Sequence, residues 1–112
     1  MNKLDLADTR TKNPPLVKWP GGKRNLLRNI LPLLPRTFDR YYEPFVGSGA
    51  LYFAIQPPKA TLSDTNVDLI NLYVQVRDRP NDLVNLLKRF RNSEEFYYKI
   101  RSRSPRMPLS RA

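Results

Sequence analysis

The sequence contains neither cysteine nor histidine among its 112 residues. Without cysteine, the chain forms no disulfide and holds no metal through thiolates. Without histidine, it lacks the commonest protein metal ligand and the usual proton acceptor at neutral pH. A Ser-His-Asp or Cys-His catalytic group is therefore excluded within this chain, and we expect no metal site.

Long apolar runs are absent as well. No segment approaches the ~20 apolar residues that a membrane-spanning helix needs. The first five residues, MNKLD, lack the apolar core of a secretory signal peptide. We therefore expect no membrane partner, and a cytoplasmic protein.

Acidic residues are few, since 10 Asp and Glu stand against 20 Lys and Arg and give a net charge of +10. A domain this basic favours a polyanionic partner, nucleic acid first and an anionic membrane second. A basic surface without any partner is the alternative that composition leaves open.

The chain has the length of one small domain and divides into three stretches. Residues 1–14 are a polar leader, residues 15–103 carry periodic apolar patterns, and residues 104–112 form a basic tail that we expect to be unstructured. Within the middle stretch, helices are predicted over 25–34, 50–55, 67–76, 80–90 and 93–100, and strands over 40–45 and 60–63. Strands that alternate with helices predict an α/β fold with a parallel sheet of the Rossmann type, here with too few strands to be complete.

The segment Lys18–Lys23, KWPGGK, resembles the end of a phosphate loop. A Walker loop requires a glycine five residues before the Gly-Lys pair and a Ser or Thr after it. Here Val17 and Arg24 occupy those two positions, so that interpretation fails. Read alone, Trp19 is more typical of a core or interface aromatic residue, and Lys23 of a solvated lysine.

A second glycine motif follows in Glu43–Gly49, EPFVGSG, directly after a candidate strand. Glycine permits a tight turn and a close approach of a ligand to the backbone. Asp64 lies 17 residues after Gly47, near the ~20-residue spacing at which a carboxylate reaches a bound ribose. The alternative is an ordinary turn, with Asp64 capping the helix that follows.

Three blocks, VKWPGGK, YEPFVGSGAL and LSDTNVDLINLY, resemble the N-terminal part of the Dam-type adenine-specific DNA methyltransferases. The resemblance covers about residues 15–103. It implies methyl transfer from S-adenosylmethionine to N6 of adenine in double-stranded DNA. It also implies a three-layer, Rossmann-like methyltransferase fold, here partial, with a separate target-recognition domain. Such an enzyme works in the cytoplasm of a bacterium or phage host, associated with the nucleoid.

The resemblance assigns cofactor-binding roles to six residues. Trp19 would cover part of S-adenosylmethionine, and Lys23 would bind the carboxylate of its methionine part. Glu43 would pair with the methionine ammonium or orient the glycine turn. Gly47 and Gly49 would admit the ligand, and Asp64 would bind its ribose. The full set is Trp19, Lys23, Glu43, Gly47, Gly49 and Asp64.

The catalytic motif of this family, Asp-Pro-Pro-Tyr, is absent from the sequence. The partial matches NPPL at residues 13–16 and QPPK at residues 56–59 lack the aromatic residue, and the first precedes the cofactor motifs. We therefore name no catalytic residue, and we expect an N-terminal fragment of such an enzyme that is inactive alone.

Two other functions stay open at the level of sequence. The charge of +10 and four tyrosines in pairs at 41–42 and 97–98 also suit a non-catalytic nucleic-acid-binding module. A degenerate remnant without function is the third possibility. The sequence identifies neither a DNA target nor a restriction partner.

Overall fold

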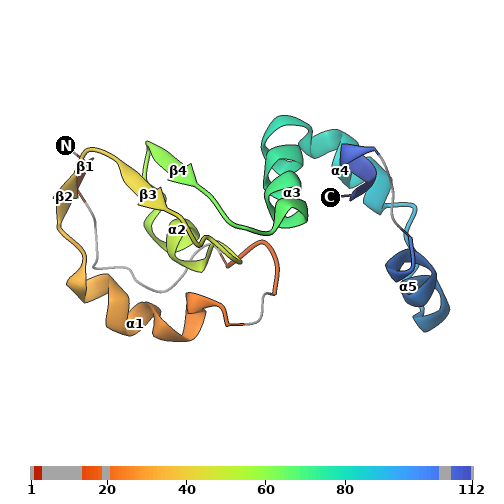
Figure 1. Cartoon of the computed structure of the whole chain (residues 1–112), viewed down its shortest axis with the longest axis horizontal. Helices are drawn as coiled ribbons and strands as arrows, with labels where there is room; N and C mark the ends of the chain where they lie inside the picture. The colour runs from red at the N-terminus through yellow and green to blue at the C-terminus, as the bar shows by residue number, and fades with distance from the viewer. Residues whose placement is uncertain (1, 4–13, 19–20, 104–106, 112) are drawn as a thin grey trace. The chain divides into compact units, whose positions relative to one another are not determined.

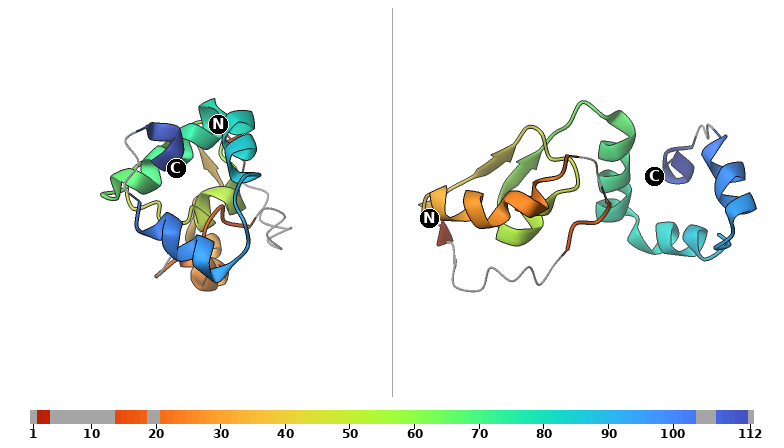
Figure 2. Two further views of the ribbon diagram at one scale, coloured as in Figure 1. Left: turned by 90° about the vertical axis from the view of Figure 1, so that its right-hand side faces the viewer. Right: turned by 90° about the horizontal axis from the view of Figure 1, so that it is seen from below.

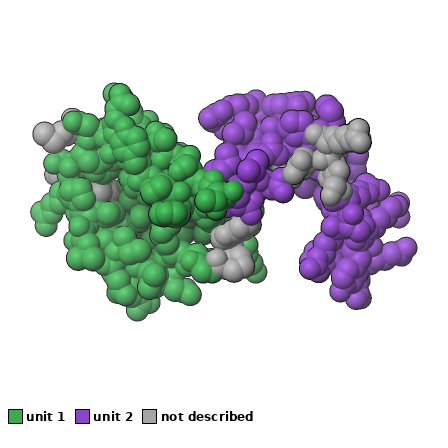
Figure 3. All heavy atoms as spheres, viewed as in Figure 1, with its two compact units in different colours: residues 1–65 green, residues 66–112 purple. Residues whose placement is uncertain are grey.

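The computed structural model of the chain describes residues 2–3, 14–18, 21–103 and 107–111. The chain divides into two compact units, residues 1–65 and residues 66–112 (Figure 3).

The main sheet of the first unit is parallel. Strand β3 (Tyr41–Glu43) pairs with β4 (Ala60–Leu62), and helix α2 (Ala50–Ile55) connects them (Figure 1). Backbone bonding continues past the strand ends, because the N–H of Ser63 donates to the carbonyl of Glu43 and the N–H of Val46 to the carbonyl of Ser63, each at 3.0 Å. The predicted α/β class with a short parallel sheet is thus confirmed.

The first unit also contains an antiparallel pair that the sequence did not predict. Strand β1 (Asn2–Lys3), within the expected leader, pairs with β2 (Thr37–Phe38). Each strand has two residues, too few to show the period-two alternation by which strands are recognised.

The predicted helix over 25–34 is a succession of three short helices. It runs through η2 (Lys23–Leu26), α1 (Leu27–Ile30) and η3 (Leu31–Leu33), of which η2 and η3 are 3-10 helices. Pro32 lies in the first turn of η3. The N–H groups of a first turn have no partner within their helix, so a proline, which lacks an N–H, is tolerated there.

The core of the first unit lies between this helical segment and α2. Leu27 and Leu31 meet Leu51, and all three are buried. Around them pack five partly buried side chains, those of Ile30, Leu34, Tyr41, Ala54 and Ile55. In the right-hand view of Figure 2, α1 and α2 lie on the same side of β3 and β4.

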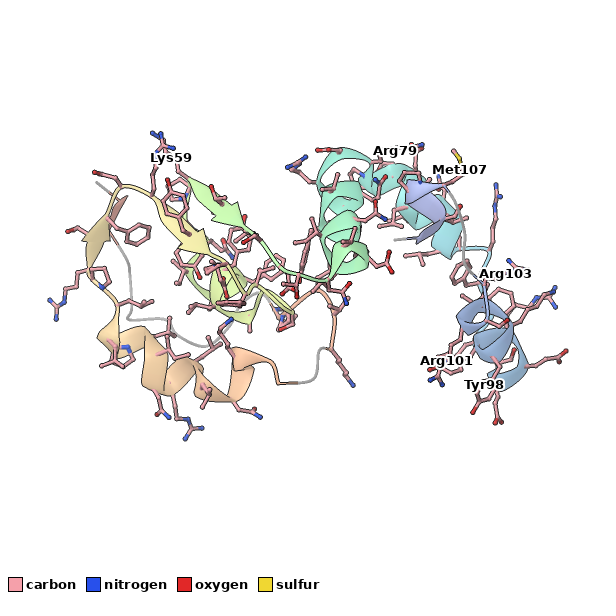
Figure 4. The ribbon with its side chains drawn as sticks, viewed as in Figure 1. Lys59, Arg79, Tyr98, Arg101, Arg103 and Met107 are labelled. Carbon is pink, nitrogen blue, oxygen red and sulfur yellow. The ribbon has the colours of Figure 1, made fainter. Side chains whose placement is uncertain are left out.

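The second unit consists of helices α3 (Val67–Asp78), α4 (Pro80–Leu87), α5 (Glu94–Arg101) and α6 (Pro108–Arg111). Two of these helices begin at a residue whose side chain caps the first turn. The side chain of Asn66 accepts from the N–H of Leu69 at the start of α3, and Ser93 accepts from Phe96 at the start of α5. Helix α5 buries no side chain and exposes Tyr98 and Arg101 (Figure 4).

The expectation of an unstructured tail over 104–112 is wrong for its last part. Helix α6 forms there and contacts α3 and α4. The side-chain amide of Asn71 donates to the carbonyl of Pro108 at 2.7 Å. Composition predicted disorder because the tail is basic and polar, but its contacts with α3 and α4 hold this turn. No helix in the described part of the chain is long and apolar enough to cross a membrane.

Candidate functional site

The carboxylate of Glu43 is the most enclosed charged group among the described side chains of the first unit. Glu43 is the last residue of β3 and is 5% exposed. The hydroxyl of Tyr41 donates to Oε2 at 2.6 Å, and the ammonium of Lys23 donates to Oε1 at 3.1 Å. Because a buried carboxylate is costly unless it is paired and hydrogen-bonded, these two partners are what allow the acid to lie there.

Lys23 connects the first glycine motif to the second. It begins η2, and besides Glu43 its ammonium donates to the backbone carbonyl of Phe45 at 2.5 Å. The Lys23 side chain is 34% exposed, whereas that of Glu43 is 6% exposed. Lys23 therefore reaches from solvent to a buried acid, and the solvated lysine that the sequence also permitted is not observed.

Tyr41 is a site residue that the sequence analysis missed. Burial, the hydrogen bond to Glu43 and the negative charge of Glu43 raise the pKa of Tyr41 far above its usual value. The hydroxyl therefore stays protonated and remains a donor. The available signal was the spacing, since residues two apart on a strand face the same side.

The Gly47-Ser48-Gly49 turn follows β3 and leads into α2. Gly47 has φ +51° and Gly49 has φ +74°, the left-handed region in which glycine has no steric penalty. Ser48, between them, is 4% exposed. The glycines are therefore required by the path of the backbone from strand to helix.

Asp64 lies just after β4, at the same edge of the sheet. Its Oδ2 accepts from the N–H of Gly47 at 3.0 Å, and the neighbouring Ser63 hydroxyl donates to the carbonyl of Pro44 at 3.2 Å. The side-chain cap of α3 is Asn66, not Asp64. Asp64 thus holds the glycine turn, and the alternative role as a helix cap is not observed.

A cavity of about 580 Å³ is lined by residues of both glycine motifs. Gly21, Gly22 and Asn25 line one part of it, and the second motif contributes Ser48. Its described lining residues do not include Lys23, Glu43, Gly47, Gly49 or Asp64. The volume is in the range of small-molecule sites. Trp19, which was predicted to cover a ligand, lies outside the described residues. Among the residues that are described, no group of three or more Asp, Glu, His or Cys is placed to hold a metal ion.

Comparison with known proteins agrees with the sequence resemblance. A family model described as D12 class N6 adenine-specific DNA methyltransferase matches residues 19–109. A type II methyltransferase of Lactococcus lactis subsp. cremoris, M1.LlaDCHI, is 46% identical over 103 residues, which is 90% of this chain and 34% of that protein. A DNA adenine methylase of Serratia marcescens is 40% identical over 91 residues, covering 77% of this chain and 33% of that protein.

The chain spans about a third of the length of these two relatives. The family model nevertheless matches well over half of the chain, and its range includes all six residues to which the resemblance assigned cofactor roles. The predicted resemblance is confirmed: this chain belongs to the D12 class of N6 adenine-specific DNA methyltransferases.

Proposed function

We propose that the chain forms the S-adenosylmethionine-binding part of a DNA methyltransferase that methylates N6 of adenine in double-stranded DNA. The observation that carries this proposal is the meeting of Glu43, the glycine turn and Asp64 after the carboxyl ends of two parallel strands. Open α/β sheets bind their ligands at this edge. The proposed reaction, methyl transfer to N6 of adenine, is inferred from membership of the family.

Asp64 is the proposed ribose ligand. A carboxylate can accept several hydrogen bonds through its two oxygens, so the acid that holds the N–H of Gly47 can belong to a site that also binds vicinal ribose hydroxyls. The left-handed Gly47 and Gly49 allow the nucleoside to lie against the backbone. One acid would then fix both the turn and the ligand that rests on it.

Lys23 is the proposed partner of the methionine carboxylate. The resemblance left two roles for Glu43, pairing with the methionine ammonium or orientation of the glycine turn. Its two oxygens bond Tyr41 and Lys23, so we propose that Glu43 orients Lys23. Trp19 is assigned to cover the ligand. S-adenosylmethionine supplies the methyl group, and these residues bind and orient it.

The remaining parts of the proposal concern the whole domain. Residues 15–103 would contribute the cofactor-binding half of a three-layer, Rossmann-like domain. The duplex partner is consistent with the net charge of +10. The cytoplasm, at the nucleoid of a bacterium or phage host, is the proposed location.

Calorimetric titration of the 112-residue chain with S-adenosylmethionine tests the site. Asp64→Asn keeps an oxygen to accept from the N–H of Gly47 but replaces the other acceptor by a donor amide, so we expect affinity to fall by about tenfold or more. Asp82→Asn is the matched control, because it makes the same change at an exposed position of α4 and should leave affinity unchanged.

Two results would overturn the proposal. One is a folded wild-type chain, judged by circular dichroism, that binds no S-adenosylmethionine. The other is equal affinity in Asp64→Asn and wild type. Salt-sensitive DNA binding without any cofactor binding would instead support the non-catalytic nucleic-acid-binding module.

A further inference from the structure

We propose that Tyr41 is a positioning residue of the cofactor site, acting through Glu43 to hold the Lys23 ammonium where it binds the amino-acid carboxylate of the ligand. This inference rests on the proposed function and adds to it a residue that does not touch the ligand.

The three side chains form one continuous hydrogen-bonded series. The Tyr41 hydroxyl donates to one oxygen of Glu43 at 2.6 Å, and Lys23 donates to the other at 3.1 Å. The carboxylate is therefore bonded on both sides, and its plane is fixed by two partners rather than one. Because Tyr41 and Glu43 lie on one face of β3, the strand itself sets the first contact.

The Tyr41 hydroxyl suits this role because it is a permanent donor. Its ring packs beside the buried leucines between α1 and α2. Burial and the adjacent Glu43 charge raise its pKa, so it does not ionise at physiological pH. Removal of the hydroxyl would leave Oε2 of a buried carboxylate without its bond, and the carboxylate would turn toward Lys23 to compensate.

The position of Lys23 matters because its donors are limited. An ammonium group has three N–H donors. Glu43 and the carbonyl of Phe45 take two of them in the described part of the chain, which leaves one for a ligand. If Glu43 turned to accept from a second N–H of Lys23, it would compete with the carboxylate of the ligand for that donor.

A pair of related ligands separates this role from a general structural one. S-adenosylhomocysteine and 5′-methylthioadenosine share the nucleoside thioether, but only the first has the amino-acid carboxylate. We expect Tyr41→Phe to weaken binding of S-adenosylhomocysteine by about two- to tenfold, the range of one hydrogen bond, and to leave 5′-methylthioadenosine unchanged. Lys23→Met should show the same selectivity with a larger loss, on the order of tenfold or more.

Tyr42→Phe is the matched control, because Tyr42 is the next residue of β3 and is 64% exposed. It should bind both ligands as wild type does. Equal losses for both ligands in Tyr41→Phe would overturn the positioning role and indicate a structural one. Wild-type affinity for both ligands in Tyr41→Phe would also overturn it while leaving the proposed function intact. A wild-type chain that binds neither ligand would overturn the proposed function and this inference together.

Discussion

The bond between Tyr41 and Glu43 makes a specific prediction about stability at alkaline pH. At about pH 8, Tyr41→Phe removes a hydrogen bond to a charged group, which contributes about 1.5–3 kcal/mol. Because the Tyr41 ring is only partly buried, we expect the lower end of that range. The free energy of unfolding should therefore fall by about 1.5 kcal/mol.

The cost of this substitution should shrink as pH rises above about 10, the ordinary pKa of tyrosine. The folded pKa of Tyr41 is raised by burial and by Glu43, so above this pH the unfolded chain loses the proton while the folded chain keeps it. The folded state then binds more protons, and its stability falls as pH rises. One group contributes at most about 1.4 kcal/mol per pH unit.

Urea unfolding followed by circular dichroism at about pH 8 and about pH 11, on either side of the ordinary tyrosine pKa, measures both effects. Wild type should lose more stability between these two values than Tyr41→Phe does, so the two curves converge. Tyr42→Phe should track wild type, because the Tyr42 side chain is exposed on the same strand. A constant difference between wild type and Tyr41→Phe at both pH values would refute the reasoning.

Two further predictions concern α2 and catalysis. Gln56 ends α2 with φ +50° and is exposed, so Gln56→Gly should raise the free energy of unfolding by about 0.5–1 kcal/mol in urea denaturation, whereas Gln56→Ala should give no gain. The 112-residue chain should transfer no tritiated methyl from S-adenosylmethionine to duplex DNA, because its sequence lacks the catalytic motif Asp-Pro-Pro-Tyr. Measurable incorporation of tritium into the DNA would contradict this prediction and show that other residues of the chain can replace the motif.

The helices and the parallel strands were predictable because their signals are local. Apolar spacing and cap residues locate α2, α3 and α5 to within a few positions, and the proline at the start of α4 is a first-turn signal. Strands β1 and β2 were not predictable, since two residues carry no periodicity. Helix α6 was missed because its support, the bond from Asn71 to Pro108, is a tertiary contact across 37 positions.

The candidate site shows the same difference between features with a local sequence signal and features that depend on tertiary contacts. The sequence assigned Gly47 and Asp64 to one ligand site. Residues that follow adjacent parallel strands meet at one sheet edge, and the bond between these two residues shows that they lie side by side. The pairing of Lys23 with Glu43 was not predictable, since it depends on how η2 folds back against β3 across 20 positions. The family resemblance assigned Lys23 a contact with the ligand, and it assigned Glu43 either such a contact or the orientation of the glycine turn. It was silent about the contact between Lys23 and Glu43.

That mutual contact changes how ligand binding must work at this site. A carboxylate at 5% exposure needs compensation before any ligand arrives, and Lys23 supplies it. If the proposed function holds, the amino-acid part of the cofactor would therefore join an existing ion pair and share its cation, rather than meet two separate charges. Sharing weakens the attraction to the ligand carboxylate, but it fixes the Lys23 ammonium in advance, so less side-chain freedom is lost on binding. On this reasoning Glu43 acts on affinity through the order it imposes on Lys23, and Tyr41 acts one step earlier in the same series.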